Sequence, residues 1–532
     1  MPVKSIPQDA QNAIDEMVKR RHNAQPKSFD EQLELLTAWG QQYRKENTRT
    51  VHHQDGTESV TTKRMPARMI ADRIEAVASI AKLGETDREL ESAPLVLYVS
   101  DRGIYTHSTA RVRRMILALE PACTIKDRNE VEWLLDGEAT AKAPESSPSL
   151  IPVGNGIYNT DSGEFQPFTP EIVFTSKIAT NYNPNATEPS FNGWKFSDWL
   201  NELAQGDEAK RTLIWQMIAS IVKNRDTANV FFAFVDNGQG RTGKSTLEQL
   251  LMNLVGKDNY TSLKLDEFGH DFKLANAYGA RLIIGDDNEP KGFIDDGSNL
   301  KSIVTNETVL LNPKGAKPFT AKFFATVVQS MNGVPTFRDK SGGLYRRFRM
   351  LNFPKQYPDT PAGKRIKNYY IYDRQLLEWI LKKALEVDVT TIIDTKESQE
   401  LVYDTRLDND PVLYFVEEVV GQLKSIRLPT SFLFNLFCAF MKSENSPTKL
   451  KQRSFTKQVR PYMEDKGWKY DNKSLTASKY FNQDDMKLVH QFDDLVGTNY
   501  PRLAEQEVRT RKGIFYRDDK AGQPPLTKVS GL

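Results

Sequence analysis

Residues 231–246 read FFAFVDNGQGRTGKST, and this stretch decides how the middle of the chain folds. The run of large apolar residues from Phe231 to Val235 has the length and composition of a buried strand. Glycines follow at 238, 240 and 243, and Lys244 comes directly after the last of them. Apolar residues then recur at helical spacing, at Leu247, Leu250, Leu251 and Leu254. Strand, glycine-rich loop and helix in this order form the setting of a phosphate-binding loop.

The residue types in this loop suit ATP with its Mg²⁺. Glycines let the backbone wrap closely around phosphates, so that backbone N–H groups and the helix N-terminus face them. Lys244 would neutralise charge on the β- and γ-phosphates, and Ser245 would bind Mg²⁺. The predicted ATP-binding residues are Gly238, Gly240, Thr242, Gly243, Lys244, Ser245 and Thr246.

Carboxylates follow a second strand-like run, RLIIGDDNE at 281–289. A nucleotide hydrolase needs acids at the end of a neighbouring strand, to hold the metal and to polarise the attacking water. Adjacent side chains on a strand point to opposite sides, so one of Asp286 and Asp287 would serve the metal and the other the water. Both join Ser245 as predicted Mg²⁺ ligands, Asp287 is favoured as the main acid, and Glu289 is a third candidate. The plainer alternative is an acidic turn that caps a strand.

A third apolar run, KFFATVVQSMNGVP at 322–335, carries Asn332 near its end. An amide at that place could sense the γ-phosphate or orient the attacking water. Arg338 and the cluster YRRFR at 345–349 follow, before another strand at 350–353. Arginine is the residue type that stabilises charge on a transferred phosphoryl group from an adjacent subunit. The alternative for each arginine is an ordinary salt bridge.

Length and composition describe a multidomain protein of ordinary globular type. A chain of 532 residues is expected to form two to four domains. No apolar stretch approaches the roughly 18 residues of a membrane span, and the N-terminus has no signal-peptide pattern. The two cysteines, Cys123 and Cys438, lie far apart, and the six histidines are scattered, so we expect a cytoplasmic protein (of a bacterial host) without zinc.

The region before the loop is expected to be helical at first and then mixed. Apolar spacing predicts helices around Ile14, Met17 and Val18 and from Met69 through Ile80 and Ala81, with an exposed loop at 49–64 between them. A hairpin is expected at 94–106, helices at 111–119 and 129–135, and a flexible connector or surface loop at 137–149. Short strands alternate with turns at 150–186.

The C-terminal fifth is the basic pole of the chain, with 20 Lys and Arg against 12 Asp and Glu from residue 421 onward. Helices at 373–385, 410–423, 431–441 and 454–465, followed by strand-like pieces at 468–470 and 513–517, predict a helix-turn-helix with a wing. Lys449, Lys451, Arg453, Lys457 and Arg460 would place positive charge on or before the recognition helix, and Arg509, Arg511 and Lys512 near the wing. The insertion at 476–503 would enlarge the wing or pack on the ATPase, and a helical lid is the alternative for the whole region.

Together, GQGRTGKST, LIIGDDNE, LKSIVTNETVLLNPKGAKPF, ATVVQSMNGVP and YRRFRMLNFP resemble motifs A, B, B-prime and C and the arginine finger of superfamily 3 helicases. Upstream, residues 155–186 resemble the segment before the motor in the poxvirus- and phage-type primase-helicase family. The chain therefore looks like a replication protein of a phage, plasmid or pathogenicity island. Motif B departs from the commonest form of that family, which has glutamate where Asp287 stands.

This resemblance implies an AAA+ homo-oligomer, usually a hexameric ring, with ATP sites between subunits and central hairpins on single-stranded DNA. Arg346 and Arg347 fit the finger position best. Lys314 and Lys317 map to the hairpin as DNA-binding residues, with a merely polar turn as the alternative. Lys451, Arg453 and Lys457 complete the predicted DNA-binding set. A primase domain is not expected, because the first 90 residues are predicted to be mostly helical.

The expected fold class is α/β, with a P-loop AAA+ domain between a helical and α+β N-terminal region and a winged-helix-like domain. The expected parts are 1–140, a family-specific segment at 150–200, the motor at 201–360, a helical connector at 361–410 and the DNA-binding domain at 411–532. The expected function is a replicative DNA helicase acting on single-stranded and forked DNA, with origin duplex as a further partner and no membrane. The alternative is an ATP-switched initiator or helicase loader, and a packaging motor fits the motifs less well.

Overall fold

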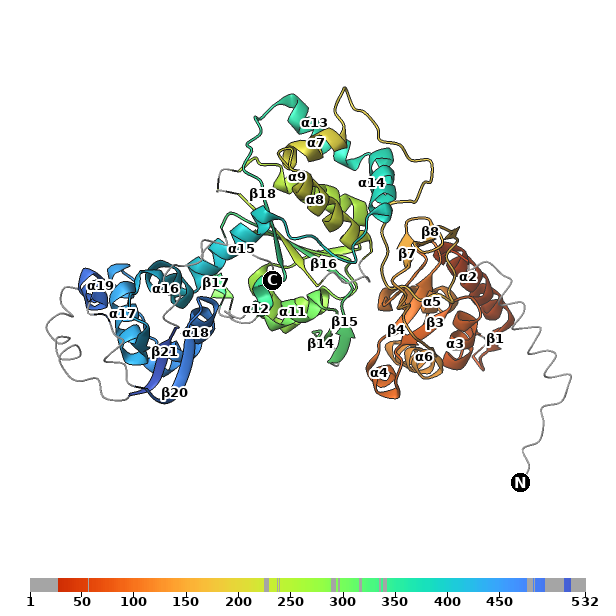
Figure 1. The fold of residues 1–532 in the computed structure, drawn as a ribbon. Coiled ribbons are helices and arrows are strands. Elements are labelled where there is room, and N and C mark those ends of the chain that lie inside the picture. The colour runs from red at the N-terminus through yellow and green to blue at the C-terminus, as the bar shows by residue number, and fades with distance from the viewer. Residues whose placement is uncertain are drawn as a thin grey trace. The chain divides into compact units, whose positions relative to one another are not determined.

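The computed structural model describes residues 27–55, 57–223, 229–236, 238, 240–288, 293–294, 297–314, 318–333, 336–337, 342–475, 482, 484–492 and 511–517. The chain divides into two compact units. The larger contains residues 1–339 and 346–399, and the smaller contains 340–345 and 400–532. Figure 1 shows the elements in chain order.

The N-terminal part of the larger unit is a mixed sheet packed with helices (Figure 1). Its four strands pair in the order β5-β4-β3-β6, with β3 antiparallel to β4 and parallel to β6. Leu36, Ile70, Met115 and Leu135, one from each of four helices, are fully buried in one shared core. The elements are α2 (Phe29–Glu46), β1 (Thr48–His52), β2 (Glu58–Thr62), α3 (Ala67–Glu75), β3 (Ile80–Leu83), α4 (Asp87–Ser92), β4 (Leu95–Val99), β5 (Ile104–Thr106), α5 (Thr109–Leu119), α6 (Ile125–Glu138) and β6 (Thr140–Lys142).

Three expectations for this part are wrong. Ile80 and Ala81 lie in β3 and not in a helix, because pairing with strands on both sides outweighs a short helical pattern. The stretch 49–64 contains the exposed hairpin β1–β2, and the stretch 137–149 contains β6. A primase domain was not expected because the start of the chain was predicted to be mostly helical. Since this part contains a mixed sheet, its secondary structure no longer argues against such a domain. The helix expected around Ile14 lies outside the described residues.

A small antiparallel sheet separates this part from the centre of the unit. β7 (Leu150–Val153), β8 (Gly156–Asn159) and β9 (Phe165–Gln166) pair in that order, which confirms the alternation of strands and turns expected after residue 150.

The centre of the unit is a parallel sheet of five strands in the order β11-β12-β16-β10-β18. Its strands are β10 (Phe231–Val235), β11 (Tyr260–Ser262), β12 (Leu282–Asn288), β16 (Thr326–Met331) and β18 (Phe348–Asn352). The helices around it are α7 (Phe196–Leu203), α8 (Glu208–Val222), α9 (Lys244–Val255), η1 (Leu265–Gly269), α10 (Asp271–Asn276), α11 (Ser298–Val304), α13 (Pro361–Asn368), η2 (Tyr370–Tyr372) and α14 (Arg374–Glu386). Two further pairs are β13 (Phe293–Ile294) with β17 (Thr336–Phe337), and the hairpin of β14 (Thr308–Leu311) with β15 (Phe319–Lys322).

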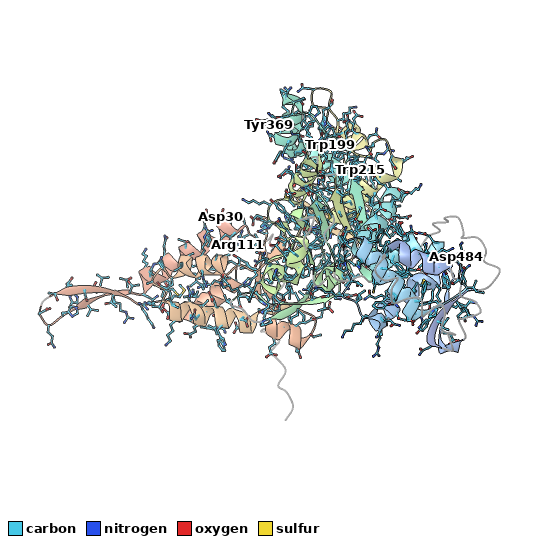
Figure 2. The ribbon with its side chains drawn as sticks, turned by 90° about the vertical axis from the view of Figure 1, so that its left-hand side faces the viewer. Asp30, Arg111, Trp199, Trp215, Tyr369 and Asp484 are labelled. Carbon is cyan, nitrogen blue, oxygen red and sulfur yellow. The ribbon has the colours of Figure 1, made fainter. Side chains whose placement is uncertain are left out.

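Alternate side chains of these strands enter cores on opposite faces of the sheet. Phe232 and Phe234 join the largest core with residues of α7, α8, α9 and α14, which lie together on one face (Figure 1). In that core Phe196 packs edge-on against Trp199 and Trp215, with ring centroids 5.9 and 5.7 Å away. Figure 2 labels the two tryptophans. The loop between β10 and α9 is thus held at both ends by elements that are buried in the same apolar core.

The smaller unit combines helices with a three-stranded antiparallel sheet in the order β19-β21-β20. Its elements are α12 (Gly342–Tyr345), the greater part of α15 (Lys396–Asn409), α16 (Pro411–Val419), η3 (Val420–Gln422), β19 (Arg427–Pro429), α17 (Thr430–Ser443), α18 (Gln452–Asp465), β20 (Lys469–Leu475), α19 (Asp484–Phe492) and β21 (Arg511–Tyr516). The helices and strands expected between 410 and 517 are confirmed. Within the expected insertion, α19 packs on this unit's own core through Val489.

None of the helices in the described ranges is both long and apolar enough to cross a membrane.

Candidate active site

Three neighbouring strands of the central sheet end at one edge. β16 lies between β10 and β12, and all three are parallel, so the segments that follow them emerge side by side. From β10 the chain passes to the far strand β11, and β18 later returns to the other side of β10. β10 is therefore the switch point of the strand order, where open α/β sheets bind ligands beyond the carboxyl ends of their strands.

The loop after β10 is shaped by glycines. Gly238, Gly240 and Gly243 have φ values of 72°, 64° and 89°, which glycine adopts without strain. A Cβ atom at 238 or 240 would meet nothing within 4 Å, whereas a Cβ at 243 would lie 2.9 Å from Leu203. Gly243 is the N-cap of α9 and provides no side-chain hydrogen bond. The start of the helix thus has no side-chain cap that would compete with an anion.

Lys244, in the first turn of α9, is buried and surrounded by oxygen atoms. Its Nζ lies 2.9 Å from Asp236 Oδ2. It also donates hydrogen bonds to the carbonyl of Met331 at 3.0 Å and to Asn332 Oδ1 at 3.2 Å. The ends of β10 and β16 therefore meet at this ammonium group, and the expected role of Asn332 at the γ-phosphate stays a prediction.

Asp236, the residue directly after β10, organises the loop. Its carboxylate accepts hydrogen bonds from the backbone N–H of Gly238 at 3.1 Å and from Thr242 Oγ1 at 3.2 Å, besides pairing with Lys244. Thr242 is buried by these contacts, while Ser245 is exposed in the first turn of α9. Sequence reasoning missed Asp236, although its place at the end of the strand was a usable signal.

The end of β12 carries the acids and is irregular. Gly285 pairs with Gln329 of β16, but Asn288 already pairs with Met331, so β12 contains an extra residue there. Such a bulge changes which way side chains point, and bulges are common beside active sites. The expectation that Asp286 and Asp287 point to opposite sides of the strand therefore stays a prediction. Asp286 is exposed, while the Asp287 side chain and Glu289 lie outside the described residues.

A buried amide pair fixes this bulge. Asn288 donates to Gln329 Oε1 and to the Ser330 carbonyl, both at 3.0 Å, and its Oδ1 accepts from Leu265 N at 2.9 Å. Gln329 in turn donates to the Leu263 carbonyl at 3.1 Å. Sequence reasoning missed both amides, because their pairing depends on the register of two strands far apart in the chain.

Arg346 and Arg347 lie at the opposite edge of the sheet. The carbonyl of Arg347 accepts a hydrogen bond from Phe231 N, at the start of β10, whereas Lys244 follows the end of β10. A strand of five residues is roughly 16 Å long. Arg346 is exposed, and burial together with the nearby Arg346 lowers the pKa of the Arg347 guanidinium. Neither arginine can reach the phosphate loop of its own chain. Arg338 lies outside the described residues.

The predicted DNA-binding residues lie in two places. Lys314 is exposed in the turn between β14 and β15, and Lys317 lies outside the described residues. In the smaller unit, Lys451 is the N-cap of α18, and Arg453 and Lys457 are exposed on that helix. Arg460 follows on the same helix but pairs with Glu464 at 2.8 Å.

Three segments of the chain match known sequence families. Residues 106–205 match a family described as D5 N terminal like, and residues 407–496 match one described as Poxvirus D5 protein-like. Between them, residues 237–347 match a family of unknown function, DUF5906. The chain thus carries D5-like segments before and after the central sheet, and the middle match begins at the glycine loop and ends at Arg347.

Among solved structures, the chain is matched by those of the NrS-1 C terminal region. One apo A form is 13% identical, covers 78% of this chain and 88% of its own, and has a TM-score of 0.43. A second structure is 12% identical, covers 85% of this chain and 100% of its own chain, and has a TM-score of 0.46.

Proposed function

We propose that this protein is an ATP-hydrolysing motor of the AAA+ type that acts on DNA as a replicative helicase. The observation that carries the proposal is the meeting of the ends of β10 and β16 at Lys244. The glycine loop, the buried ammonium group and Asn332 form one constellation there, and the acids of β12 lie on the next strand. The D5-like segments on both sides support a role in replication.

The residues of this edge divide the work of phosphoryl transfer. Backbone N–H groups of the loop and of α9 bind the phosphates, and Lys244 neutralises their charge. Asn332 orients the attacking water or senses the γ-phosphate, next to the lysine that it contacts. Ser245 and Asp286 provide oxygen ligands of the kind Mg²⁺ prefers, and the bound ion would neutralise phosphate charge.

The arginines at the other edge support a homo-oligomer. A group that stabilises transferred-phosphoryl charge must touch the phosphate, and Arg346 and Arg347 cannot touch their own. A second copy of the chain would bring them to the site, as in a closed ring of identical interfaces. We propose a hexamer, in which Lys314 of the β14–β15 hairpin contacts single-stranded DNA.

The smaller unit supports a second contact with DNA. Its elements α16, β19, α17, α18, β20 and β21 follow one another in the order expected of a winged helix. We propose that α18 is the recognition helix. The exposed cations Lys451, Arg453 and Lys457 would lie along duplex phosphates, for example at an origin.

Unwinding of forked DNA by the wild type and by Lys244→Ala, with ATP and Mg²⁺, tests this function. We expect the wild type alone to displace a strand, because the variant cannot neutralise the phosphates of ATP. Both proteins should bind DNA equally well in the absence of nucleotide, which serves as the control for folding.

A second candidate is an initiator or loader for which ATP is a switch. The basic face of α18 favours it, since origin binding needs no translocation. Slow hydrolysis and DNA binding by the wild type without any strand displacement would select this candidate. Failure of the wild type to hydrolyse ATP at all would reject both.

A further inference from the structure

Arg349, two residues after the proposed finger position of Arg347, donates hydrogen bonds to backbone carbonyls of two segments of the chain. Its Nη1 donates to the carbonyl of Arg346 at 3.1 Å and to that of Phe348 at 2.8 Å. Its Nε donates to the carbonyl of Ile393 at 3.1 Å, and Asp394 Oδ2 lies 3.6 Å from Nη1. The side chain is 13% exposed, so it is not placed to contact a neighbouring chain.

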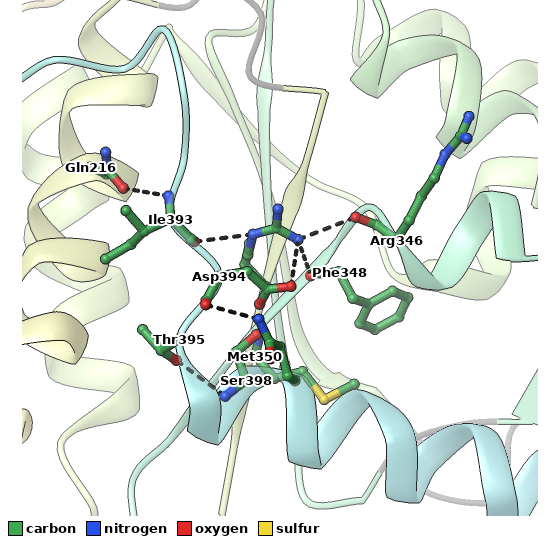
Figure 3. Close-up of polar contacts among 10 residues, drawn as sticks. Gln216, Arg346, Phe348, Met350, Ile393, Asp394, Thr395 and Ser398 are labelled. Atoms are coloured by element: carbon green, nitrogen blue, oxygen red, sulfur yellow. Dashed lines mark hydrogen bonds and ion pairs between the residues drawn. The ribbon is translucent and has the colours of Figure 1, made fainter. Parts of the chain in front are cut away.

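The segment that holds Arg349 is itself anchored in the core of the unit. Gln216, buried in α8, accepts from Ile393 N at 2.9 Å and donates to the carbonyls of Asp388 and Thr391. A continuous series of hydrogen bonds thus runs from α8 through Ile393 and Arg349 to the turn that carries Arg346 (Figure 3).

We propose that Arg349 is a positioning residue for the arginine finger, which it holds at the angle required by the ATP site of the next chain. The inference rests on the proposed function and names a residue on which the site between chains depends. A planar guanidinium can bond three carbonyls in fixed directions, which neither lysine nor glutamine can do.

The proposal predicts a loss of turnover without a loss of ATP binding. In Arg349→Gln the turn is released, and a finger misplaced by about 1 Å costs about 100-fold in kcat. ATP binding, measured with a fluorescent analogue on the full chain, should be unchanged because the glycine loop lies at the opposite edge of the sheet.

Mixing of variants separates this role from a general loss of structure. Lys244→Ala chains cannot bind ATP productively but keep a well-placed finger. Added to Arg349→Gln chains, they should restore hydrolysis, because an intact ATP site of one chain then meets an intact finger of the other. A general defect, or a role in the chain's own ATP site, would leave the mixture inactive and would overturn the proposal.

Two further variants make the result decisive. Arg346→Ala and Arg347→Ala, each mixed with Lys244→Ala, test the site between chains itself. If neither is complemented, the proposed oligomeric mechanism fails. If one is complemented and Arg349→Gln is not, only this inference fails.

Arg211→Gln on α8, which loses an exposed pair with Glu208, is the matched control and should remain fully active. If Arg349→Gln does not fold, Asp394→Asn should show a smaller loss, restored in the same mixture.

Discussion

At the scale of single residues, substitution of Asn332 tests the proposed ATP site most directly. Its Oδ1 lies 3.2 Å from Lys244 Nζ, just after the end of β16. On the proposed function, the γ-phosphate and its attacking water would lie beside this amide. We expect Asn332→Ala to lower kcat for ATP by about 100-fold, the usual cost of removing one preorganised polar group, with little change in ATP affinity. Steady-state hydrolysis with separate binding measurements checks this. Asn368→Ala, an exposed amide on α13, is the control, and equal rates for the two variants would contradict the assignment.

Gly285 is required by the close approach of two strands. A Cβ atom there would lie 2.0 Å from Gln329 Oε1, and Gln329 is fully buried and bonded at both ends. We therefore expect Gly285→Ala to lower the free energy of unfolding by about 1–3 kcal/mol, as overpacking does. Chemical denaturation measures this. Gly269→Ala, where a Cβ would meet nothing within 4 Å, should be much milder, and an equal loss in both would contradict the explanation.

These residues show which parts of the site can be predicted. The glycine loop could be predicted because its strand, glycines and helix are contiguous. Asn288 and Gln329 could not, because 41 residues separate them and only the strand register brings their amides together. The role of Arg349 was hidden for the same reason: its partner Ile393 lies 44 residues further on.

At the scale of elements, α18 has one exposed cationic face. We expect Lys457→Ala to weaken duplex binding and to lower the slope of log affinity against log salt by about one, since one phosphate contact is lost. Fluorescence anisotropy at several salt concentrations measures the slope. Lys466→Ala, at the end of the same helix, removes a cation already paired with Glu417 at 2.6 Å and should change the slope less. Identical slopes for both variants would argue against α18 as the binding helix.

Lys177 bonds to the turn between β7 and β8, and its ammonium group has a lowered pKa. Its Nζ donates to the carbonyl of Gly154 at 2.9 Å, and burial lowers the pKa of its ammonium group to about 8 from 10.5. Between these values the unfolded chain holds a proton that the folded chain has lost, so stability rises with pH. The free energy of unfolding of the wild type should therefore increase relative to Lys177→Met between about pH 7.5 and about pH 9.5. Parallel pH curves for the two proteins would show that Lys177 does not titrate in this way.

Helices and strands could be predicted where the apolar pattern was long, and the prediction failed where the pattern was short. Helices such as α14 and α17 show their periodicity over 13 and 14 residues and were expected within a few positions. β3 has four residues, and its apolar pair Ile80 and Ala81 continues a helical spacing from α3. Only the pairing with β4 and β6 decides that it is a strand.

At the scale of the whole molecule, the candidate site residues are divided between the two edges of the central sheet. The carboxyl edge holds the glycine loop, Lys244 and Asn332, and the opposite edge holds Arg346 and Arg347. On the proposed function, each chain would provide both halves of an ATP site, which lie at opposite ends of β10. Hydrolysis should require a second chain, whereas ATP binding should not.

Dilution tests this requirement directly. As the wild-type protein is diluted through its assembly range, we expect the rate of ATP hydrolysis per chain to fall, since fewer sites meet a finger. Binding of a fluorescent ATP analogue per chain should fall much less, because the loop and Lys244 belong to one chain. Arg346→Ala or Arg347→Ala should show the low rate at every concentration. A rate per chain that stays constant where sedimentation finds only monomers would mean that one chain completes its own site, which the separation of the two edges does not allow.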